Sequence, residues 1–586
     1  MLLDLPEDAL RSVALHLEAP DVLSLLSTHK DFQEPIGRSA TFWGQLLARD
    51  FDLAAGSIAE NTSPRQEYLT KAYVDHLPAA RWYPIRRRPV SVSAREGHLA
   101  CVLPGPDNEQ RVVITGGYSD DDEVYMMRVP SKSKTNNTVQ TWSWESLMPG
   151  NSRPSFTYGA SLNALDATTM KDGCHVARAI RFGGFQAGGY SNEVNQVWLM
   201  TARSEKVDDK NSPNPLPRST SVSWDLIQTT NPQCGAPRAY HTATLIAGRY
   251  LVILGGMMWR ESILSEAILD TQTWTWITDP ITSFGNDKPS GRHGHSVILD
   301  SRRNRLLLFG GGSGTDLLRS GKDNSEVWEL KMNDDWETNL KLPWTWSKIH
   351  NDTCTQSEID EDENENGEEA DGNSDTTMQT TRSSPPLPPA EALCIGRCHH
   401  GIKVTPNTAV FLFGSGRPST NGVIGYDLRN DCFLRPRISG PLPVPRFSGV
   451  AVYLESEGYL MTHGGYSSQQ SDCIDDLSIL DLAPFVKRDF TVLPVDTGRR
   501  PHREITNDDA QNGRINRGYG GNMFEQHQFL TQIVSLTRGG LVTPAELEEL
   551  LASRGIVSNN GVVVLGEGGD YDNDDDDDDD EYYVEE

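Results

Sequence analysis

Near the N-terminus, apolar residues recur at helical spacing. Two such stretches follow one another: Leu10, Val13, Ala14 and Leu17, then Val22, Leu25 and Leu26. Recurrence every three to four residues predicts amphipathic helices, and Asp21, after Pro20, is placed to cap the second one. Phe42 and Trp43, followed closely by two leucines, predict a third short helix. The pattern therefore indicates a three-helix module, and residues 68–76 indicate one more linker helix.

From residue 95 onward the pattern changes to short apolar runs separated by turn residues. The stretch that begins at Arg238 contains the runs HTATLI, YLVILGG, EAILD and TWTWI. These runs are short and rich in β-branched and aromatic residues, which predicts four consecutive strands. The next stretch, from Arg292, has the same four parts. A four-stranded unit that recurs along a chain is typical of a β-propeller.

An arginine followed by an apolar run and a glycine pair marks six such units. The arginines are Arg95, Arg153, Arg238, Arg292, Arg397 and Arg446. The glycine signals are Gly116-Gly117, Gly183-Gly184, Gly255-Gly256, Gly310-Gly311, Gly414-x-Gly416 and Gly464-Gly465. We expect each pair at the end of a second strand, where the backbone needs positive φ. Buried guanidinium groups can tie carbonyls of adjacent blades together, so most of these arginines are expected to be structural.

The glycine pairs, a downstream aromatic on the third strand and a tryptophan on the fourth strand resemble kelch repeats. The third-strand aromatics are Tyr125, Trp198, Trp328 and Tyr426; the fourth-strand tryptophans include Trp144, Trp224, Trp276 and Trp346. The resemblance covers residues 95–482 and implies a mainly β fold, a kelch-type β-propeller of six blades. The last two units lack the tryptophan. A strand from outside the repeats can close the ring, with residues 79–85 and 489–494 as the candidates, and a degenerate further blade in the tail is the alternative.

The N-terminal module resembles an F-box, which binds a Skp-family adaptor and through it a cullin scaffold. The resemblance rests on Leu5-Pro6, the stripe of Leu10, Val13 and Leu17, the start of the second helix at Asp21-Val22, and Phe42-Trp43. One departure is Ser27-Thr28-His29-Lys30, where the family has a hydrophobic-Cys-basic centre. The residues expected to contact the adaptor are Leu5, Pro6, Leu10, Val13, Leu17, Val22, Leu25 and Trp43. The plainer alternative is a helical bundle that caps the propeller.

The formal net charge is −29, but ten acidic residues lie between Glu358 and Asp375 and thirteen between Glu567 and Glu586. The folded part is thus only mildly acidic, which argues against nucleic acid as a ligand. No apolar run is long enough to span a membrane, and the acidic N-terminus does not resemble a signal peptide. Scattered cysteines in so long a chain are expected to be reduced thiols. We therefore expect a cytoplasmic or nuclear protein that does not bind membranes.

The expected domains are an F-box at 1–52, a helical linker at 53–88, the propeller at 89–495, and a tail at 496–586. Within the propeller, residues 352–390 are acidic and almost without apolar residues, which predicts a disordered insertion. The tail is expected to be partly helical around residues 524–536 and from Thr543, and to end in an acidic run.

Propellers bind partners with loops on one face. The expected partner contacts lie just beyond the glycine pairs and beside the repeat arginines: Tyr118, Phe185, Tyr190, Tyr240, Met258, Trp259, Arg260, His293, His399, Arg417 and Tyr466. Aromatic and arginine side chains often dominate binding energy. No phosphate-binding loop or catalytic set is evident, and Cys394, Cys398, His399 and His400 lack a second pair that would suggest zinc. We expect no metal or cofactor.

These resemblances imply a substrate-recognition subunit of an SCF-type ubiquitin ligase. In that role the propeller binds a target protein, the F-box binds the Skp-family adaptor, and the chain itself is not an enzyme. The alternative is a kelch interaction scaffold without a link to ubiquitination. Binding of the adaptor by the N-terminal module separates the two.

Overall fold

The computed structural model describes most of the chain as far as residue 493 and one short hairpin beyond it. The described residues are 7–17, 21–22, 25–26, 32–53, 63–84, 92–106, 109–119, 123–129, 140–149, 152–154, 157–186, 194–205, 219–258, 261–278, 288–313, 326–333, 336, 344–350, 396–415, 421–484, 490–493, 556–559 and 562–565. The predicted acidic insertion and tail helices lie outside these residues. Within them, no helix is both long and apolar enough to cross a membrane.

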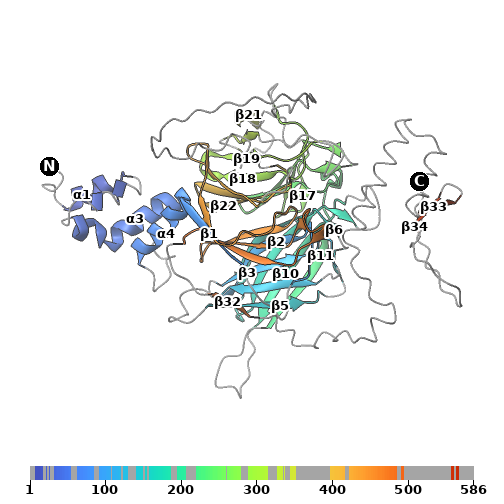
Figure 1. Cartoon of the computed structure of the whole chain (residues 1–586), viewed down its shortest axis with the longest axis horizontal. Helices are drawn as coiled ribbons and strands as arrows, with labels where there is room; N and C mark the ends of the chain where they lie inside the picture. The colour runs from blue at the N-terminus through green and yellow to red at the C-terminus, as the bar shows by residue number, and fades with distance from the viewer. Residues whose placement is uncertain are drawn as a thin grey trace, which may run out of the picture. The chain divides into compact units, whose positions relative to one another are not determined.

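The chain forms two units, residues 1–502 and 503–586. In the second, β33 (Ile556–Asn559) and β34 (Val562–Leu565) pair as an antiparallel hairpin. The first is mainly β and contains a six-bladed propeller (Figure 1). Blade 1, from the axis outward, consists of β2 (Leu99–Pro104), β3 (Gln110–Thr115), β4 (Val124–Val129) and β5 (Gln140–Leu147). Blade 2 consists of β7 (Ser161–Thr169), β8 (His175–Phe182), β10 (Val197–Glu205) and β11 (Ser219–Ile227).

The next three blades repeat this order. Blade 3 consists of β12 (Thr242–Ile246), β13 (Tyr250–Leu254), β16 (Glu266–Asp270) and β17 (Thr275–Trp276). Blade 4 consists of β18 (Ser296–Asp300), β19 (Arg305–Phe309), β20 (Val327–Lys331) and β21 (Thr345–His350). Blade 5 consists of β22 (His400–Thr405), β23 (Thr408–Leu412), β24 (Val423–Asp427) and β25 (Cys432–Leu434).

Blade 6 joins the two ends of the ring. Its inner strands are β27 (Val450–Leu454), β28 (Tyr459–His463) and β31 (Leu477–Asp481). The outer strand is β1 (Ala79–Pro84), which comes from before the first repeat and pairs antiparallel with β31. This confirms the first of the two candidate closing strands. The second candidate, β32 (Phe490–Leu493), instead adds a parallel fifth strand outside β5, as β26 (Arg437–Ser439) does outside β1.

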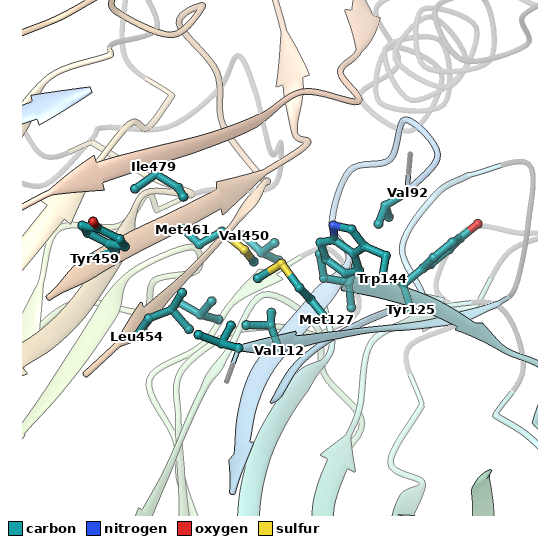
Figure 2. Packing of buried hydrophobic residues seen from close by; sticks show 13 residues of the cluster. Val92, Val112, Tyr125, Met127, Trp144, Val450, Leu454, Tyr459, Met461 and Ile479 are labelled. Atoms are coloured by element: carbon teal, nitrogen blue, oxygen red, sulfur yellow. The ribbon is translucent and has the colours of Figure 1, made fainter. Parts of the chain in front are cut away.

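The hydrophobic core consists of separate clusters between neighbouring blades. Figure 2 shows the cluster at the seam between blades 1 and 6, where Met127 and Trp144 meet Val450 and Met461. Trp224, Trp276 and Trp346 occupy corresponding clusters between blades 1 and 2, 2 and 3, and 3 and 4. Trp82 of β1 is fully buried between blades 5 and 6. The closing strand thus also supplies the tryptophan that the sixth repeat lacks.

A helical module precedes the propeller. It comprises α1 (Glu7–Ala14), the short η3 (Gln33–Gly37), α3 (Ala40–Phe51) and α4 (Pro64–His76). Ser39 and Ser63 cap the two longer helices, and Pro64 occupies the first turn of α4. Trp43 lies in the module core, donates from its Nε1 to the Gly37 carbonyl, and packs on Tyr68. Only Leu77 and Pro78 separate α4 from β1, so the module continues directly into blade 6.

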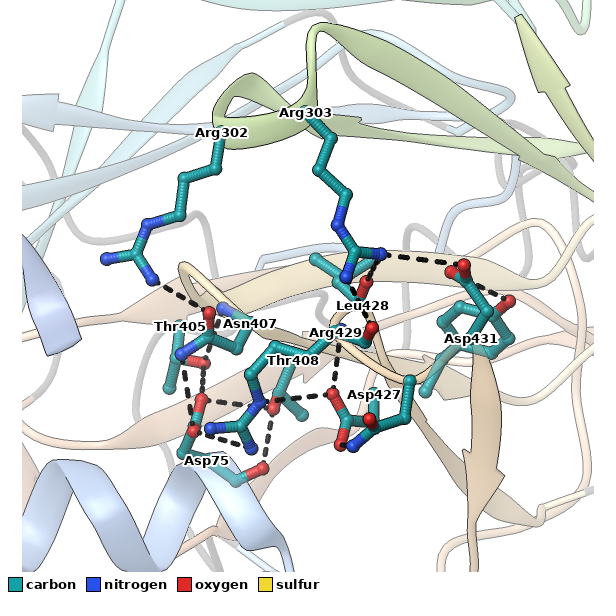
Figure 3. Close-up of polar contacts among 12 residues, drawn as sticks. Asp75, Arg302, Arg303, Thr405, Asn407, Thr408, Asp427, Leu428, Arg429 and Asp431 are labelled. Carbon is teal, nitrogen blue, oxygen red and sulfur yellow. Dashed lines mark hydrogen bonds and ion pairs between the residues drawn. The ribbon is translucent and has the colours of Figure 1, made fainter. Parts of the chain in front are cut away.

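The module is fixed to the propeller through buried polar contacts (Figure 3). Asp75, at the end of α4, is 3% exposed and accepts hydrogen bonds from the side chains of Thr405, Asn407 and Thr408 of blade 5. It also forms an ion pair with Arg429 at 3.1 Å. From the β18–β19 loop, Arg302 donates to the Asp50 carbonyl and pairs with Asp52, both at 2.9 Å. These contacts hold the module on the β18–β19 and β22–β23 loops between inner and second strands and, through Arg429, on the β24–β25 loop.

Candidate functional site

The backbone of the repeats shows which residues occupy equivalent positions at the opposite end of the strands. In each blade, a residue pair follows the second strand and is here called the doublet. Its second residue donates its N–H to one main-chain carbonyl of the next blade. The six donors are Gly117, Gly184, Gly256, Gly311, Gly414 and Gly465, and the acceptors, in the same order, are Thr157, Arg238, Arg292, Gly396, Arg446 and Arg95. Arg153 and Arg397 were therefore the wrong repeat markers in units two and five. Thr157 and Gly396 occupy the positions equivalent to the other repeat arginines. They can do so because the hydrogen bond uses the main-chain carbonyl, which any residue supplies.

The doublet of the fifth unit is also displaced by one residue from the prediction. It consists of Phe413 and Gly414, not Gly414 and Gly416, and Phe413 adopts a φ of +59° where the other blades have glycine. A phenylalanine is strained in this region. Its ring stacks on Trp82 of the closing strand and lies under the Arg446 guanidinium. These contacts offset the strain at the junction of blades 5 and 6.

The repeat arginines are structural, as predicted, but they act within a blade. Arg95, Arg238, Arg292 and Arg446 each donate to the carbonyl two residues earlier and to that of the first doublet glycine of the same blade. The prediction that they join adjacent blades was therefore wrong. The main-chain bonds from the doublets make those connections.

A closed ring of six main-chain hydrogen bonds surrounds the propeller axis. In order, Gly97, Gly159, Tyr240, Gly294, Cys398 and Ser448 each donate the N–H to the carbonyl of the preceding member, and Gly97 donates to Ser448. All six have positive φ. Tyr240 is the bulkiest member and adopts a conformation that favours glycine. Bulky residues in strained positions often mark functional sites, so the surroundings of Tyr240 define the candidate site.

Two circles of side chains lie around this ring. The residues just before the ring members are Glu96, Tyr158, Ala239, His293, Arg397 and Phe447. They pair with the residues just after the doublets, which are Tyr118, Phe185, Met257, Gly312, Ser415 and Tyr466. We call these twelve residues, together with Tyr240, the axial mouth. Its chemistry is uneven, because blades 2 and 6 contribute only aromatic side chains whereas blades 4 and 5 contribute a histidine and an arginine.

Tyr240 joins the aromatic groups of the axial mouth across the axis. Its ring centroid lies 6.4 Å from that of Tyr158 and 6.0 Å from that of Phe185. On its other side Tyr240 packs against a cluster that contains Cys398, Phe447 and Tyr466. A Cβ added at Gly159 would meet the Tyr240 ring at 3.0 Å, so the ring rests directly on this glycine. Aromatic side chains from blades 2, 3 and 6, together with Cys398 of blade 5, thus form one continuous cluster at the mouth.

Glu96 supplies the carboxylate of the axial mouth. It is partly buried, and loss of water raises its pKa to about 7. Within the described parts of the chain, no cation forms an ion pair with it. The carboxylate lies near Tyr240, whose phenol pKa is raised by burial and further by Tyr158, Glu96 and Cys398. Arg397 has interactions of its own and is 4% exposed.

Beneath the axial mouth lie buried neutral histidines. His98, His241, His295 and His399 each directly follow a ring member, and burial lowers the pKa of all four, to about 3 for His241 and His399. His241 Nε2 lies 3.0 Å from Ser161 Oγ, and His295 Nε2 lies 3.1 Å from Thr242 Oγ1 of the preceding blade. These hydrogen bonds join blades, so we assign the histidines a structural role.

The structure brings several of the predicted partner contacts to the axial mouth. Tyr118, Phe185, Tyr240, His293 and Tyr466 belong to it, Met258 adjoins it, and His399 is buried beneath it. Tyr190, Trp259, Arg260 and Arg417 lie outside the described residues. Glu96, Tyr158 and Phe447 were missed. Glu96 and Phe447 directly follow the repeat arginines Arg95 and Arg446, so the rule of looking beside the repeat position covers them, whereas Tyr158 follows Thr157, which carries no arginine signal.

The predicted adaptor contacts divide between the core and the surface of the helical module. Leu10, Val22 and Trp43 are buried in its core, so these side chains are not exposed to an adaptor in this structure. Leu17 and Leu25 pack partly buried against that core. Val13, on α1, is 42% exposed. Leu5 and Pro6 lie outside the described residues.

No group of three or more His, Cys, Asp or Glu side chains that could hold a metal ion occurs among the described residues. Cys394 of the Cys/His stretch is not among those residues. Cys398 and His399 belong to the ring and the layer beneath it, so the described part of that stretch is committed to the propeller interior.

The chain matches the following known proteins over short stretches or at low identity. No protein-family profile matches it. It is 38% identical over 68 residues to Mei4-dependent protein 6 of Schizosaccharomyces pombe, and 36% identical over 97 residues to acyl-CoA-binding domain-containing protein 4 of Arabidopsis thaliana. These stretches cover 12% and 16% of this chain and 10% and 13% of those relatives. The chain therefore matches only a small part of each curated relative.

Among solved structures, the chain is similar to a fungal alcohol oxidase of the AA5 family in complex with copper. The TM-score is 0.37 at 11% identity, over 69% of this chain and 76% of that one. It is also similar to a chain of a RAG complex with one melted and one unmelted RSS, with a TM-score of 0.39 at 11% identity over 68% and 99% of the two chains. Likeness at this level says nothing about ligand or reaction.

Proposed function

We propose that this chain is the non-catalytic substrate-recognition subunit of an SCF-type ubiquitin ligase. In this role the helical module acts as an F-box that binds a Skp-family adaptor and its cullin, and the kelch-type propeller holds a target protein. The complex would act in the cytoplasm or nucleus. A β-propeller fold suits protein interaction, and its loops offer an adaptable surface on a rigid frame.

The observation that carries the proposal is the separation of the two surfaces. In blade 5, Cys398 belongs to the same main-chain ring as Tyr240, whereas Thr405, at the far end of β22, binds Asp75 of the helical module. A six-residue strand spans about 20 Å, so the module and the axial mouth lie on opposite faces. Because buried contacts fix the module, a target at the mouth would be held in a constant direction from the adaptor, as transfer by proximity requires.

Co-expression with a Skp-family adaptor tests the proposal. We expect the full chain to form a stable one-to-one complex. Val13→Asp should weaken it at least tenfold, because a charge on an exposed apolar residue opposes docking without disturbing the core. Met170→Asp is the matched control, since Met170 is similarly exposed, at 45%, but belongs to the propeller.

The alternative is a propeller scaffold whose helical module never meets a ligase. Failure of the intact, folded chain to bind the adaptor would favour that function. Equal loss of binding in Val13→Asp and Met170→Asp would show that the interaction does not involve α1.

A further inference from the structure

The axial mouth has one carboxylate placed among aromatic rings. Glu96 stands on blade 1, between Tyr158 and Phe185 of blade 2 and Phe447 and Tyr466 of blade 6. The ring centroids of Tyr158 and Phe185 are 5.4 Å apart, and those of Phe447 and Tyr466 are 5.5 Å apart. Tyr240 lies between the two pairs and packs against both clusters. Aromatic faces around an acid form the environment that attracts organic cations.

The charges around the mouth favour a cation over an anion. The only described basic side chain in the two circles besides His293 is Arg397, which is buried and already has interaction partners. Burial holds the pKa of His293 at about 3, so this imidazole is neutral. Arg95, next to Glu96, donates instead to the carbonyls of Ser93 and Gly116. No described cation neutralises the Glu96 carboxylate, which is therefore available to a ligand when it is ionised.

We propose that the axial mouth binds a lysine or arginine side chain of the partner protein, which forms an ion pair with Glu96 between the aromatic rings of blades 2 and 6. The inference names the chemistry of the target bound in the proposed function. It adds that the partner inserts one cationic side chain at the propeller axis. Tyr240, although strained, is retained because its ring connects the two aromatic pairs and closes the floor of the site.

The first test uses small probes and the full chain labelled with 3-fluorotyrosine. The probes are the acetylated N-methylamides of lysine and arginine, with those of norleucine and glutamate for comparison. We expect the lysine and arginine probes to shift the fluorine resonance of Tyr240 saturably, with dissociation constants on the order of 1–10 mM, as suits one side chain. The resonance is assigned by its loss in Tyr240→Gly, a variant that retains the ring because three other members are glycine.

Substitution and pH test the role of Glu96. Glu96→Gln should weaken both cationic probes by about tenfold or more, because the ion pair is lost. Glu261→Gln, on the exposed hairpin strand β15 (Glu261–Ser262), is the matched control and should change nothing. Since Glu96 has a pKa near 7, affinity in the wild type should rise about tenfold between pH 6 and pH 8. The neighbouring phenol of Tyr240 stays neutral over this range because its pKa is raised.

Three results would overturn the inference: equal binding of the norleucine probe with no effect of Glu96→Gln, preference for the glutamate probe, or no saturable shift with any probe. None of these depends on the adaptor. If adaptor binding succeeds while the probes fail, the proposed function stands and the inference falls. If the probes bind while the adaptor does not, the mouth serves a scaffold outside a ligase.

Discussion

The two faces of the propeller use the same strands but carry opposite kinds of contact. On the face that holds the helical module, polar groups are matched within the chain: Asp75 has partners from blade 5, and Arg302 binds the end of α3. At the axial mouth, aromatic side chains gather around Tyr240, and the nearby Glu96 has no ion-pair partner in the described part of the chain. The first face is completed by contacts within the chain, whereas the second leaves this one carboxylate available to a ligand.

This difference shows how one fold supports two roles. Burying Asp75 without partners would cost several kcal/mol, so its network tolerates little change. The backbone of the axial mouth is held by the ring of main-chain hydrogen bonds. These bonds constrain the side chain of a ring member only where its positive φ favours glycine. The residues of the mouth can therefore vary with the partner. Those of the face that holds the helical module, here called the docking face, are constrained by stability.

The largest expected effect is a loss of folding stability at low pH, caused by buried histidines of the propeller. Burial lowers the pKa of His98, His241, His293, His295, His399, His400 and His463, all within the propeller. Since the unfolded chain binds protons below about pH 6.5 and the folded chain does not, stability is full above that pH and falls as pH drops. Each group should lose about 2 kcal/mol by pH 5. Glu96, with its raised pKa, acts in the opposite direction but is a single group.

Denaturant unfolding at pH 7.5, 6 and 5 measures this loss, which for seven such groups should total on the order of 10 kcal/mol. His241→Gln should flatten the pH dependence by about one proton, because glutamine can still bond to Ser161 but cannot titrate. An unfolding midpoint that is constant between pH 7.5 and pH 5 would show that these histidines are not held neutral.

The second effect concerns the strand that joins the two regions. Trp82→Ala should cost about 3–5 kcal/mol, because a large buried side chain leaves a cavity between blades 5 and 6. The loss loosens β1, which also carries the helical module. Urea unfolding provides the measurement, and Tyr83→Ala, a half-buried neighbour on the same strand, is the control with an expected loss of about 1 kcal/mol. Equal losses for the two variants would contradict the role of Trp82 in closure.

The third effect is confined to the docking face. Asp75→Ala should destabilise the chain by about 2–4 kcal/mol, because Arg429 and several buried hydrogen-bond donors lose their acceptor. Hydrogen exchange should accelerate in α4 while the main-chain ring of the axial mouth stays protected. Lys71→Ala removes the solvent-accessible ion pairs with Glu455 and Glu67 and should cost less than about 1 kcal/mol. Faster exchange in the ring would mean that the two faces are not independent.

Much of the frame could be predicted from the sequence, because repeated doublets and tryptophans report on repeated packing. The six blades and the closing strand 79–84 are confirmed. The prediction from sequence fails where a backbone position of the repeat is occupied by a residue other than the expected arginine or glycine. Thr157 accepts the same main-chain bond as Arg238, and Phe413 adopts the positive φ of the glycines. Nothing in the local pattern reveals such substitutions.

The candidate site was less predictable, because it depends on contacts between distant segments. Tyr118, Phe185 and Tyr466 could be proposed from their place after the doublets. The meeting of Tyr158, Tyr240 and Phe447 across the axis follows only from closure of the ring. In the helical module, apolar spacing identified Leu10 and Trp43 correctly as apolar positions of a bundle. It did not distinguish its core from its exposed surface, since both use the same residue types.

The smallest effect tests the fit of Tyr240 on Gly159. Gly159→Ala places a Cβ 3.0 Å from the Tyr240 ring at a φ of +67°, and should cost about 1–2 kcal/mol. Gly248→Ala is the matched control, because Gly248 has a φ of +63° and nothing within 4 Å of its added Cβ, so it measures the backbone cost alone. In Gly159→Ala combined with Tyr240→Gly, the part due to contact should vanish. Additive losses in that double-mutant cycle would show that the Tyr240 ring does not rest on Gly159, and the floor of the axial mouth would have to be assigned anew.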